Sequence, residues 1–207
     1  MRALLLRPAA RTLAFGLCLL PLIHLVYGAA TDQLGANPAE ALIRGLGDWS
    51  LRLLCLTLAI TPLRIRTHTP QLARYRRMLG LFTFFYVCLH LLAYGWLDMG
   101  LDLADIGRDI LKRPFILVGF TCWLLLLPLA LTSSRRAVRW LGGRQWVALH
   151  RLVYPIAGLA LLHFFWMRAG KNDFAEVAVY AAVVAVLLLE RLLRYFTPRA
   201  ATARPDR

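Results

Sequence analysis

Six long apolar stretches, separated by short segments rich in arginine or aspartate, dominate the pattern of hydrophobic and polar positions. A transmembrane helix needs roughly 20 mostly apolar residues to cross about 30 Å of hydrocarbon. The pattern therefore predicts an all-α, polytopic membrane protein whose single domain is a six-helix transmembrane bundle. The predicted spans are 11–30, 46–64, 75–97, 114–132, 147–167 and 174–196, and a cytoplasmic tail follows at 198–207.

The second predicted span has the weakest apolar pattern, because Arg44, Asp48 and Arg52 lie in or beside it. These residues are four apart, so we expect a ladder of charges on one helical face. We retain the span because its loss would put the arginine-rich loops on opposite sides of the membrane. The N-terminus is similar to a secretory signal, but its apolar run from Thr12 to Ala30 favours an uncleaved first helix.

Composition excludes several other classes of protein. Hydrophobic residues make up 59% of the 207 positions, whereas globular domains contain about 45–50%. The net charge is +14, but the cations flank apolar runs instead of forming a basic face, so nucleic acid is not an expected partner. The four cysteines lie inside apolar runs and form no CxxC or CxxCH motif, which argues against a disulfide framework, a zinc site and covalently attached haem.

The distribution of lysine and arginine predicts the orientation of the chain in the bilayer. With the N-terminus inside, 18 of the 25 cations fall on the inner side, which is a positive-inside bias that places both termini in the cytoplasm. The outer connector at 98–113 carries four aspartates, with Leu103, Ile106 and Ile110 at helical spacing. This pattern predicts a short amphipathic helix, which is either a docking surface or a solvated connector.

The histidines are the main candidates for chemistry, because ionisable residues inside a membrane are costly and commonly functional. We expect His24 only to hydrogen-bond a neighbouring helix, and we assign no role to His68 in a loop. His90 in the third span and His163 in the fifth lie at similar depth, since both spans run in the same direction. Two neutral imidazoles on facing helices can ligate a haem iron from both sides.

Arg76 and His150 lie closer to the inner side than this pair. Arg76 shares a helical face with His90, about 21 Å away along the axis. His150 and His163 are about 140° apart on an ideal helix, which conflicts with two haems stacked between the same helices. Because Pro155 lies between them, we predict that the fifth helix bends there or that His150 precedes its regular part.

Six segments carry a family resemblance: LGANPAE (34–40), TPLR (61–64), RYRRMLGLFTFFYVCLH (74–90), RPFILVG (113–119), LTS (131–133) and LGGRQWVALHRLVY (141–154). Their combination resembles the MsrQ family, haem-binding membrane subunits of bacterial periplasmic methionine sulfoxide reductase systems. That family belongs to the ferric reductase-like transmembrane superfamily. The resemblance implies haem b, a location in the bacterial inner membrane, and electron transfer to a periplasmic molybdopterin partner, MsrP, that reduces methionine sulfoxide in oxidised proteins.

The resemblance also implies an electron donor, a flavin and a set of ligands. The donor would be the quinone pool or a cytosolic flavin reductase, and FMN is implied by the resemblance alone. His90 and His163 would be axial ligands of an outer haem, and His150 would ligate an inner one. Arg76 stands where the wider superfamily places a fourth histidine, and a guanidinium suits a haem propionate better than iron. One bis-histidine haem is therefore predicted, with a second haem as a hypothesis.

Two other functions remain open at this point. The chain contains no GxGxxG or Walker motif, so hydride chemistry on a flavin or nicotinamide domain is not expected within it. A stand-alone ferric reductase-like cytochrome is one alternative to an electron-transfer subunit. A transporter with a relay of His24, His90 and His163 is the other.

Overall fold

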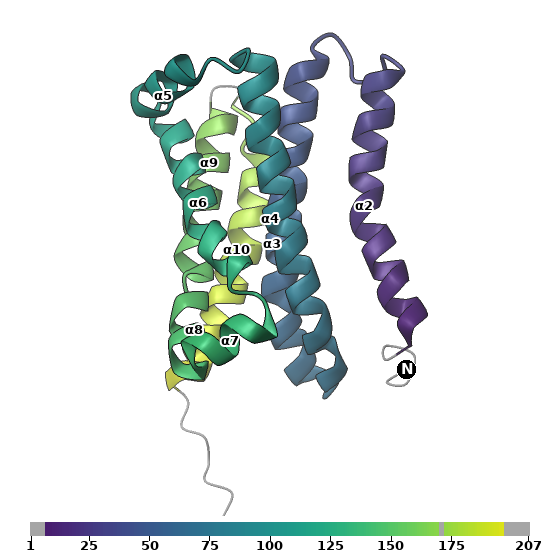
Figure 1. Cartoon of the computed structure of the whole chain (residues 1–207), viewed down its shortest axis with the longest axis vertical. Coiled ribbons are helices and arrows are strands. Elements are labelled where there is room, and N and C mark those ends of the chain that lie inside the picture. Colours follow the sequence, from purple (N-terminus) through teal and green to yellow (C-terminus); the bar gives the residue numbers. More distant parts are fainter. Residues whose placement is uncertain (1–6, 170–171, 197–207) are drawn as a thin grey trace, which may run out of the picture.

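The computed structural model describes residues 7–169 and 172–196, and the predicted tail at 198–207 lies outside them. The described residues form helices and turns without a β-strand. The long helices are α2 (Pro8–Ala30), α3 (Pro38–Arg66), α4 (Ala73–Ala93), α6 (Pro114–Leu131), α9 (Val153–Ala169) and α10 (Ala175–Phe196). They alternate in direction, so α2 begins and α10 ends at the same end of the bundle (Figure 1).

Five stretches of the described chain are long and apolar enough to cross a membrane, which confirms a multi-pass membrane protein. They are Pro8–Ala30, Pro38–Arg66, Pro70–Asp98, Pro114–Leu131 and Gly143–Ala169. Helix α10 is not among them, because charged residues such as Glu190 and Arg191 interrupt its apolar run. It nevertheless lies along the bundle beside α9 (Figure 1).

Short elements close the two ends of the bundle. The 3-10 turn η1 (Pro70–Leu72) leads into α4, and a turn of π-helix, η2 (Tyr94–Asp98), continues it. Helix α5 (Leu103–Lys112) lies at one end, and α7 (Arg135–Leu141) and α8 (Gly143–His150) lie at the other (Figure 1). Helix α5 confirms the short helix predicted in the outer connector, and its amino end is capped by the side chain of Asp102.

The fifth predicted span, 147–167, falls within the candidate span Gly143–Ala169, and this stretch contains a break between two helices. Helix α8 ends at His150, residues 151 and 152 form a turn, and α9 begins at Val153. The alternative in which His150 precedes the regular helix is therefore confirmed. Pro155 falls in the first turn of α9, where its missing N–H group leaves no hydrogen bond unmade.

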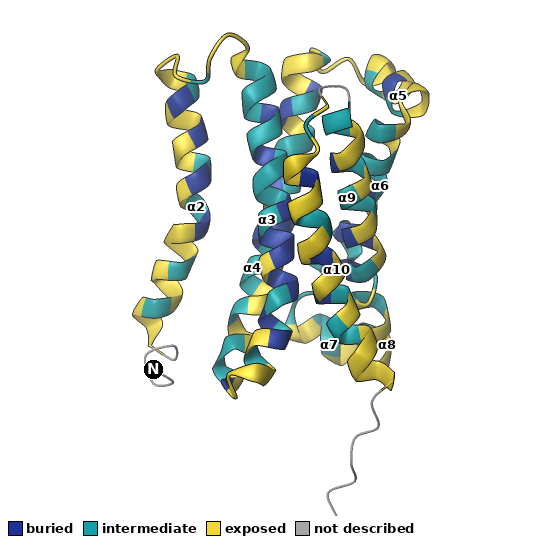
Figure 2. Cartoon of the chain, turned by 180° about the vertical axis from the view of Figure 1, so that it is seen from behind, coloured by how far each residue is buried: buried dark blue, intermediate teal, exposed yellow. Residues whose placement is uncertain are grey.

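Helix α3 is the most enclosed of the five candidate spans. It contributes to two buried clusters: Leu58 belongs to one together with Ile156 of α9, and Leu46 belongs to the other together with Tyr86 of α4. Buried positions gather on α3 and α4, whereas α2 exposes most of its surface (Figure 2). An enclosed helix tolerates charges that can find partners in the bundle, which accounts for the weak apolar pattern of the second span.

Tyr86 attaches the outlying helix α2 to the bundle. Its hydroxyl accepts a hydrogen bond from the backbone N of Leu22 (3.0 Å) and donates one to the carbonyl of Cys18 (2.8 Å). These two backbone groups are four residues apart, so the hydroxyl is inserted into the hydrogen-bond ladder of α2 beside Pro21. The fully buried Tyr86 thereby fixes the position of α2 along α4.

Candidate functional site

His90 of α4 and His163 of α9 face one another inside the bundle. Their ring centroids are 6.2 Å apart and their planes are at 79°. Nδ1 of His90 lies 2.8 Å from the carbonyl oxygen of Ile43, and Nδ1 of His163 lies 2.6 Å from that of Phe115. A carbonyl oxygen only accepts, so each Nδ1 carries the proton and donates it. Each Nε2 therefore keeps a free lone pair.

This spacing fits two imidazoles that share one metal atom. A metal–imidazole bond measures about 2.0 Å and the ring centroid lies about 1.1 Å beyond the nitrogen, so two collinear bonds separate the centroids by about 6.2 Å. Metal-bound histidines usually donate the other ring N–H to a carbonyl or carboxylate, as both rings do here. The described residues contain no group of three or more His, Cys, Asp or Glu that could hold a metal ion. The pair therefore suits a haem iron, whose porphyrin supplies the remaining ligands.

Two glycines allow α3 and α6 to approach the imidazoles closely. A Cβ atom at Gly47 of α3 would lie 3.1 Å from Cε1 of His90, and one at Gly119 of α6 would lie 2.8 Å from Cε1 of His163. Optimal contacts between carbon atoms are about 3.5–4.0 Å, so any larger residue would press on the rings. Sequence reasoning included Gly119 only as the end of a motif and missed Gly47, because spacing alone does not reveal what a glycine faces.

A cavity of about 110 Å³ lies beside the two imidazoles. Its wall is mainly apolar, with Leu51, Val87 and Ile156 among the lining residues, and it ends in charged side chains that include Arg44 and Arg168. An apolar wall around an iron site limits the access of water.

Arg44 has an unsatisfied donor in this cavity. Its Nη2 pairs with Glu40 at 2.7 Å, but its Nε is buried without a hydrogen-bond partner in the described part of the chain. A buried unpaired N–H group is costly and indicates a missing acceptor. A carboxylate such as a haem propionate would satisfy it through a charge-assisted hydrogen bond.

The three charges expected to form a ladder on α3 make their direct contacts with other residues. Within residues 7–169 and 172–196 no ion pair joins Arg44, Asp48 and Arg52 to one another. Asp48 lies 3.6 Å from Arg168 of α9, and Nε of Arg52 donates to the hydroxyl of Tyr180 in α10 at 2.9 Å. The charges of α3 thus hold α9 and α10 against it at the end of the bundle nearest the two imidazoles.

A second cavity, of about 310 Å³, contains His150 and Arg76 in its wall. It shares the wall residues Leu54, Thr83 and Leu126 with the first cavity, so the two lie one after the other along the bundle. The sequence expectation that Arg76 and His150 lie together, away from the pair of His90 and His163, therefore agrees with the structure.

His150 is held differently from the facing pair. Its ring stacks on Trp146 at 4.0 Å, and its Nε2 lies 3.1 Å from Oγ1 of Thr132. That hydroxyl donates its proton to the carbonyl of Pro128 at 2.6 Å, so it accepts from Nε2–H of His150. The free lone pair of His150 is consequently on Nδ1, the opposite tautomer to His90 and His163.

The two remaining histidines lie apart from these cavities. His24 is exposed on α2 and makes no hydrogen bond with the described residues, so its expected bond to a neighbouring helix is absent. His68 lies in the turn after α3 with a positive φ of 49°. Because His24 lines neither cavity, the structure contradicts a relay of His24, His90 and His163.

Comparison with known proteins gives matches over most of the chain. Residues 46–161 match the family described as ferric reductase like transmembrane component. A protein of Polaromonas naphthalenivorans is 66% identical over 184 residues, which cover 89% of this chain and 84% of the relative. A protein of Ralstonia nicotianae is 55% identical over 180 residues, which cover 87% of this chain and 83% of the relative. A protein of Herminiimonas arsenicoxydans is 51% identical over 182 residues, which cover 88% of this chain and 84% of the relative. All three are named protein-methionine-sulfoxide reductase heme-binding subunit MsrQ, and no solved structure matches.

Proposed function

Because the chain belongs to the MsrQ family of ferric reductase-like membrane proteins, we propose that it is the haem-binding, electron-transferring subunit of a methionine sulfoxide reductase system. The observation that carries the proposal is the facing pair of His90 and His163, with both Nδ1 atoms anchored and both Nε2 atoms free. A bound haem b supplies reversible one-electron chemistry. The protein contributes the ligands, their orientation and a dry cavity.

Each part of the first cavity has a role in this proposal. His90 and His163 hold the iron, and the carbonyl groups of Ile43 and Phe115 fix the tautomer and direction of the two rings. Gly47 and Gly119 leave room for the rings in that orientation. At the charged end of the cavity, the orphaned Nε of Arg44 supports a role in binding a propionate.

The second cavity is a candidate for a second haem. We propose His150 as its single histidine ligand, through Nδ1 or through Nε2 after release of Thr132, and Arg76 as a partner for a propionate. His150 would be the only histidine to hold the group in this cavity, whereas both His90 and His163 would hold the group in the first cavity.

The chemistry of the two ends supports the direction of electron flow. We propose that the end with α7 and α8, which is rich in arginine, faces the cytoplasm of a bacterium and receives electrons from the quinone pool or a cytosolic flavin reductase. The opposite end faces the periplasm and delivers them to MsrP, with α10 as the sixth span of one inner-membrane domain. We propose FMN as a further cofactor on the strength of the family resemblance alone, and we assign no residues to it.

The acidic outer connector at 98–113 is the proposed docking surface for MsrP, but its aspartates are not equivalent. Asp102 caps α5, and Asp109 is buried, with its carboxylate bound to the hydroxyl of Tyr94 (2.6 Å) and to Arg113 (2.7 Å). Asp105 is exposed and pairs with Arg108 only at the surface. Asp105 can therefore reach a partner without loss of the local fold.

The haem content of histidine variants tests the proposal. The purified protein is expected to show a haem absorption spectrum, and His90→Ala and His163→Ala are expected to lose the outer haem because each removes an axial ligand. His24→Ala is the matched control, since His24 is an exposed histidine of α2. A colourless wild-type protein, or full haem content in His90→Ala, would contradict the proposal.

The haem content of the histidine variants also shows whether the protein has one haem site or two. Two sites predict that His150→Ala loses one haem and keeps the outer one, whereas complete loss in both His90→Ala and His150→Ala would indicate a single site. Reoxidation of the reduced protein distinguishes the stand-alone cytochrome from the subunit. Electron transfer to MsrP supports the subunit, and transfer to ferric chelates alone would favour a ferric reductase.

A further inference from the structure

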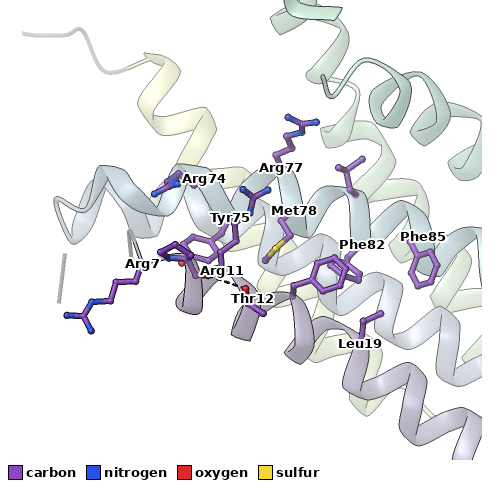
Figure 3. A pocket seen from close by; sticks show the side chains of 13 residues that line it. Arg7, Arg11, Thr12, Leu19, Arg74, Tyr75, Arg77, Met78, Phe82 and Phe85 are labelled. Carbon is purple, nitrogen blue, oxygen red and sulfur yellow. Dashed lines mark hydrogen bonds between the residues drawn. The ribbon is translucent and has the colours of Figure 1, made fainter. Parts of the chain in front are cut away.

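A groove between α2 and α4 is separate from the first cavity and adjoins the second, with which it shares only Arg77 among the described lining residues. Its volume is about 790 Å³, which is within the range of about 300–1,000 Å³ typical of ligand sites. The lining residues run from the beginning of each helix, including the preceding residue Arg7, to Leu19 of α2 and Phe85 of α4 (Figure 3). Nothing in the proposed electron-transfer function uses this groove.

One end of the groove is strongly positive. Arg7 and Arg11 from α2 and its amino cap, and Arg74 and Arg77 from α4, are among its lining residues. The described lining contains no aspartate or glutamate, and no described carboxylate lies within 4 Å of these four guanidinium groups. Neither helix has an acidic residue in its first turn, so the positive ends of both helix dipoles add to the charge.

The other end of the groove is apolar. Phe15, Leu19, Phe82 and Phe85 continue from the arginines toward the middle of the two helices (Figure 3). Phe82 is buried and contacts the ring of Phe15 edge-on at 5.0 Å, whereas Phe15 and Phe85 remain exposed. The positive end of the groove is complementary to the phosphate headgroup of a phospholipid, and its apolar end is complementary to an acyl chain.

We propose that this groove is a binding site for one anionic diacyl phospholipid, whose phosphate contacts the arginines and whose acyl chain lies on the phenylalanines. Charge complementarity determines the choice of an anionic lipid, because basic pockets between transmembrane helices bind such headgroups. The apolar end of the groove favours a lipid over a soluble phosphate, because only a lipid has an acyl chain to cover it. A bound lipid would also fill the space between α4 and α2, next to the contact that Tyr86 makes with α2.

Lipid retention by the full chain tests this site. The protein is reconstituted in nanodiscs of equal phosphatidylglycerol and phosphatidylcholine, and native mass spectrometry counts the lipids that remain after release. The wild type is expected to retain one phosphatidylglycerol in preference to phosphatidylcholine. An arginine near an anionic headgroup is worth about a fivefold change in affinity, so the double variant Arg11→Gln/Arg74→Gln should lose about 25-fold.

Two controls test whether lipid retention depends on this groove: a double variant with the same change of charge at another site, and inorganic phosphate as a competitor. Arg136→Gln/Arg139→Gln removes the same charge from exposed positions of α7 at the same end of the bundle and should retain the lipid. Arg7→Gln/Arg11→Gln, at positions that line the groove and not the second cavity, provides a second test if the first pair alters folding, which thermal unfolding would reveal. Inorganic phosphate should not displace the lipid. Equal retention of the two lipids, equal loss in the α7 control, or displacement by phosphate would overturn the proposal.

Discussion

Replacing Gly119 by alanine is a sharp test of the proposed outer haem site, because it adds one methyl group beside the ring of His163, a proposed ligand. The new Cβ atom would lie 2.8 Å from Cε1, 2.9 Å from Nδ1 and 3.2 Å from Nε2 of His163. The shortest of these is about 0.7 Å inside the optimal carbon–carbon contact of about 3.5 Å. The imidazole ring must therefore move, or α6 must move away from α9.

The hydrogen bond of His163 makes that movement costly. Its Nδ1 lies 2.6 Å from the carbonyl of Phe115, which is one helical turn before Gly119 on the same helix. Overpacking a filled site costs about 1–3 kcal/mol, and loss of the groups that orient a metal ligand lowers metal affinity by about 10–100-fold. We therefore expect Gly119→Ala to lower haem affinity by about that factor.

The assay is a haem titration of the purified protein, followed by absorbance and combined with thermal unfolding. Gly47→Ala should give a smaller loss, since its Cβ atom would lie 3.1 Å from the ring of His90. Gly158→Ala is the control, because no atom lies within 4 Å of its added Cβ. Alanine is favoured over glycine in a helix by about 0.5–1 kcal/mol, so this control should be neutral or slightly more stable.

The relative haem affinities of the three glycine variants test whether α3 and α6 lie against the imidazole rings. Wild-type haem affinity and an unchanged spectrum in Gly119→Ala would refute the reasoning, because the ring would then not be held against α6. An equal loss of haem in Gly158→Ala would show that the effect comes from any change in helix packing. Loss confined to Gly119→Ala and Gly47→Ala would support the close approach of both helices to the ligands.

Three further predictions concern the bundle and its outer surface. Tyr86→Phe should destabilise the protein by about 1–3 kcal/mol in thermal unfolding, because it leaves two backbone groups of α2 unpaired, whereas Tyr195→Phe at an exposed position should have no effect. Arg168→Gln should cost about 1–3 kcal/mol, since it breaks three ion pairs of a side chain that is 18% exposed. The exposed pair of Arg108 should contribute about 0–1 kcal/mol when Arg108→Gln is measured in the same way. Asp105→Asn should slow electron delivery to MsrP in stopped-flow measurements without a change in the haem spectrum, and an unchanged rate would exclude this carboxylate from docking.

Much of the membrane architecture could be predicted from the chain alone. Long apolar runs indicate helices that span the membrane, so hydropathy predicted the positions of α2, α4 and α6 closely. The break before α9 was also within reach, since Pro155 and the angular offset between His150 and His163 already conflicted with a straight helix. The pairing of His90 with His163 followed from their equal depth in two parallel helices.

The partners of polar groups depended on contacts between helices far apart in the sequence. Local spacing suggested that Asp48 would pair within α3, but packing brought Arg168 of α9 to it. The tautomers of the histidines likewise depended on which carbonyl or hydroxyl group came within hydrogen-bond distance, as Thr132 does for His150. The hydropathy of a segment depends only on its own residues, so it can be read from the sequence alone. Hydrogen bonds, ion pairs and the clearance at Gly119 depend on distances of a few ångströms between segments, which exist only once the helices have packed.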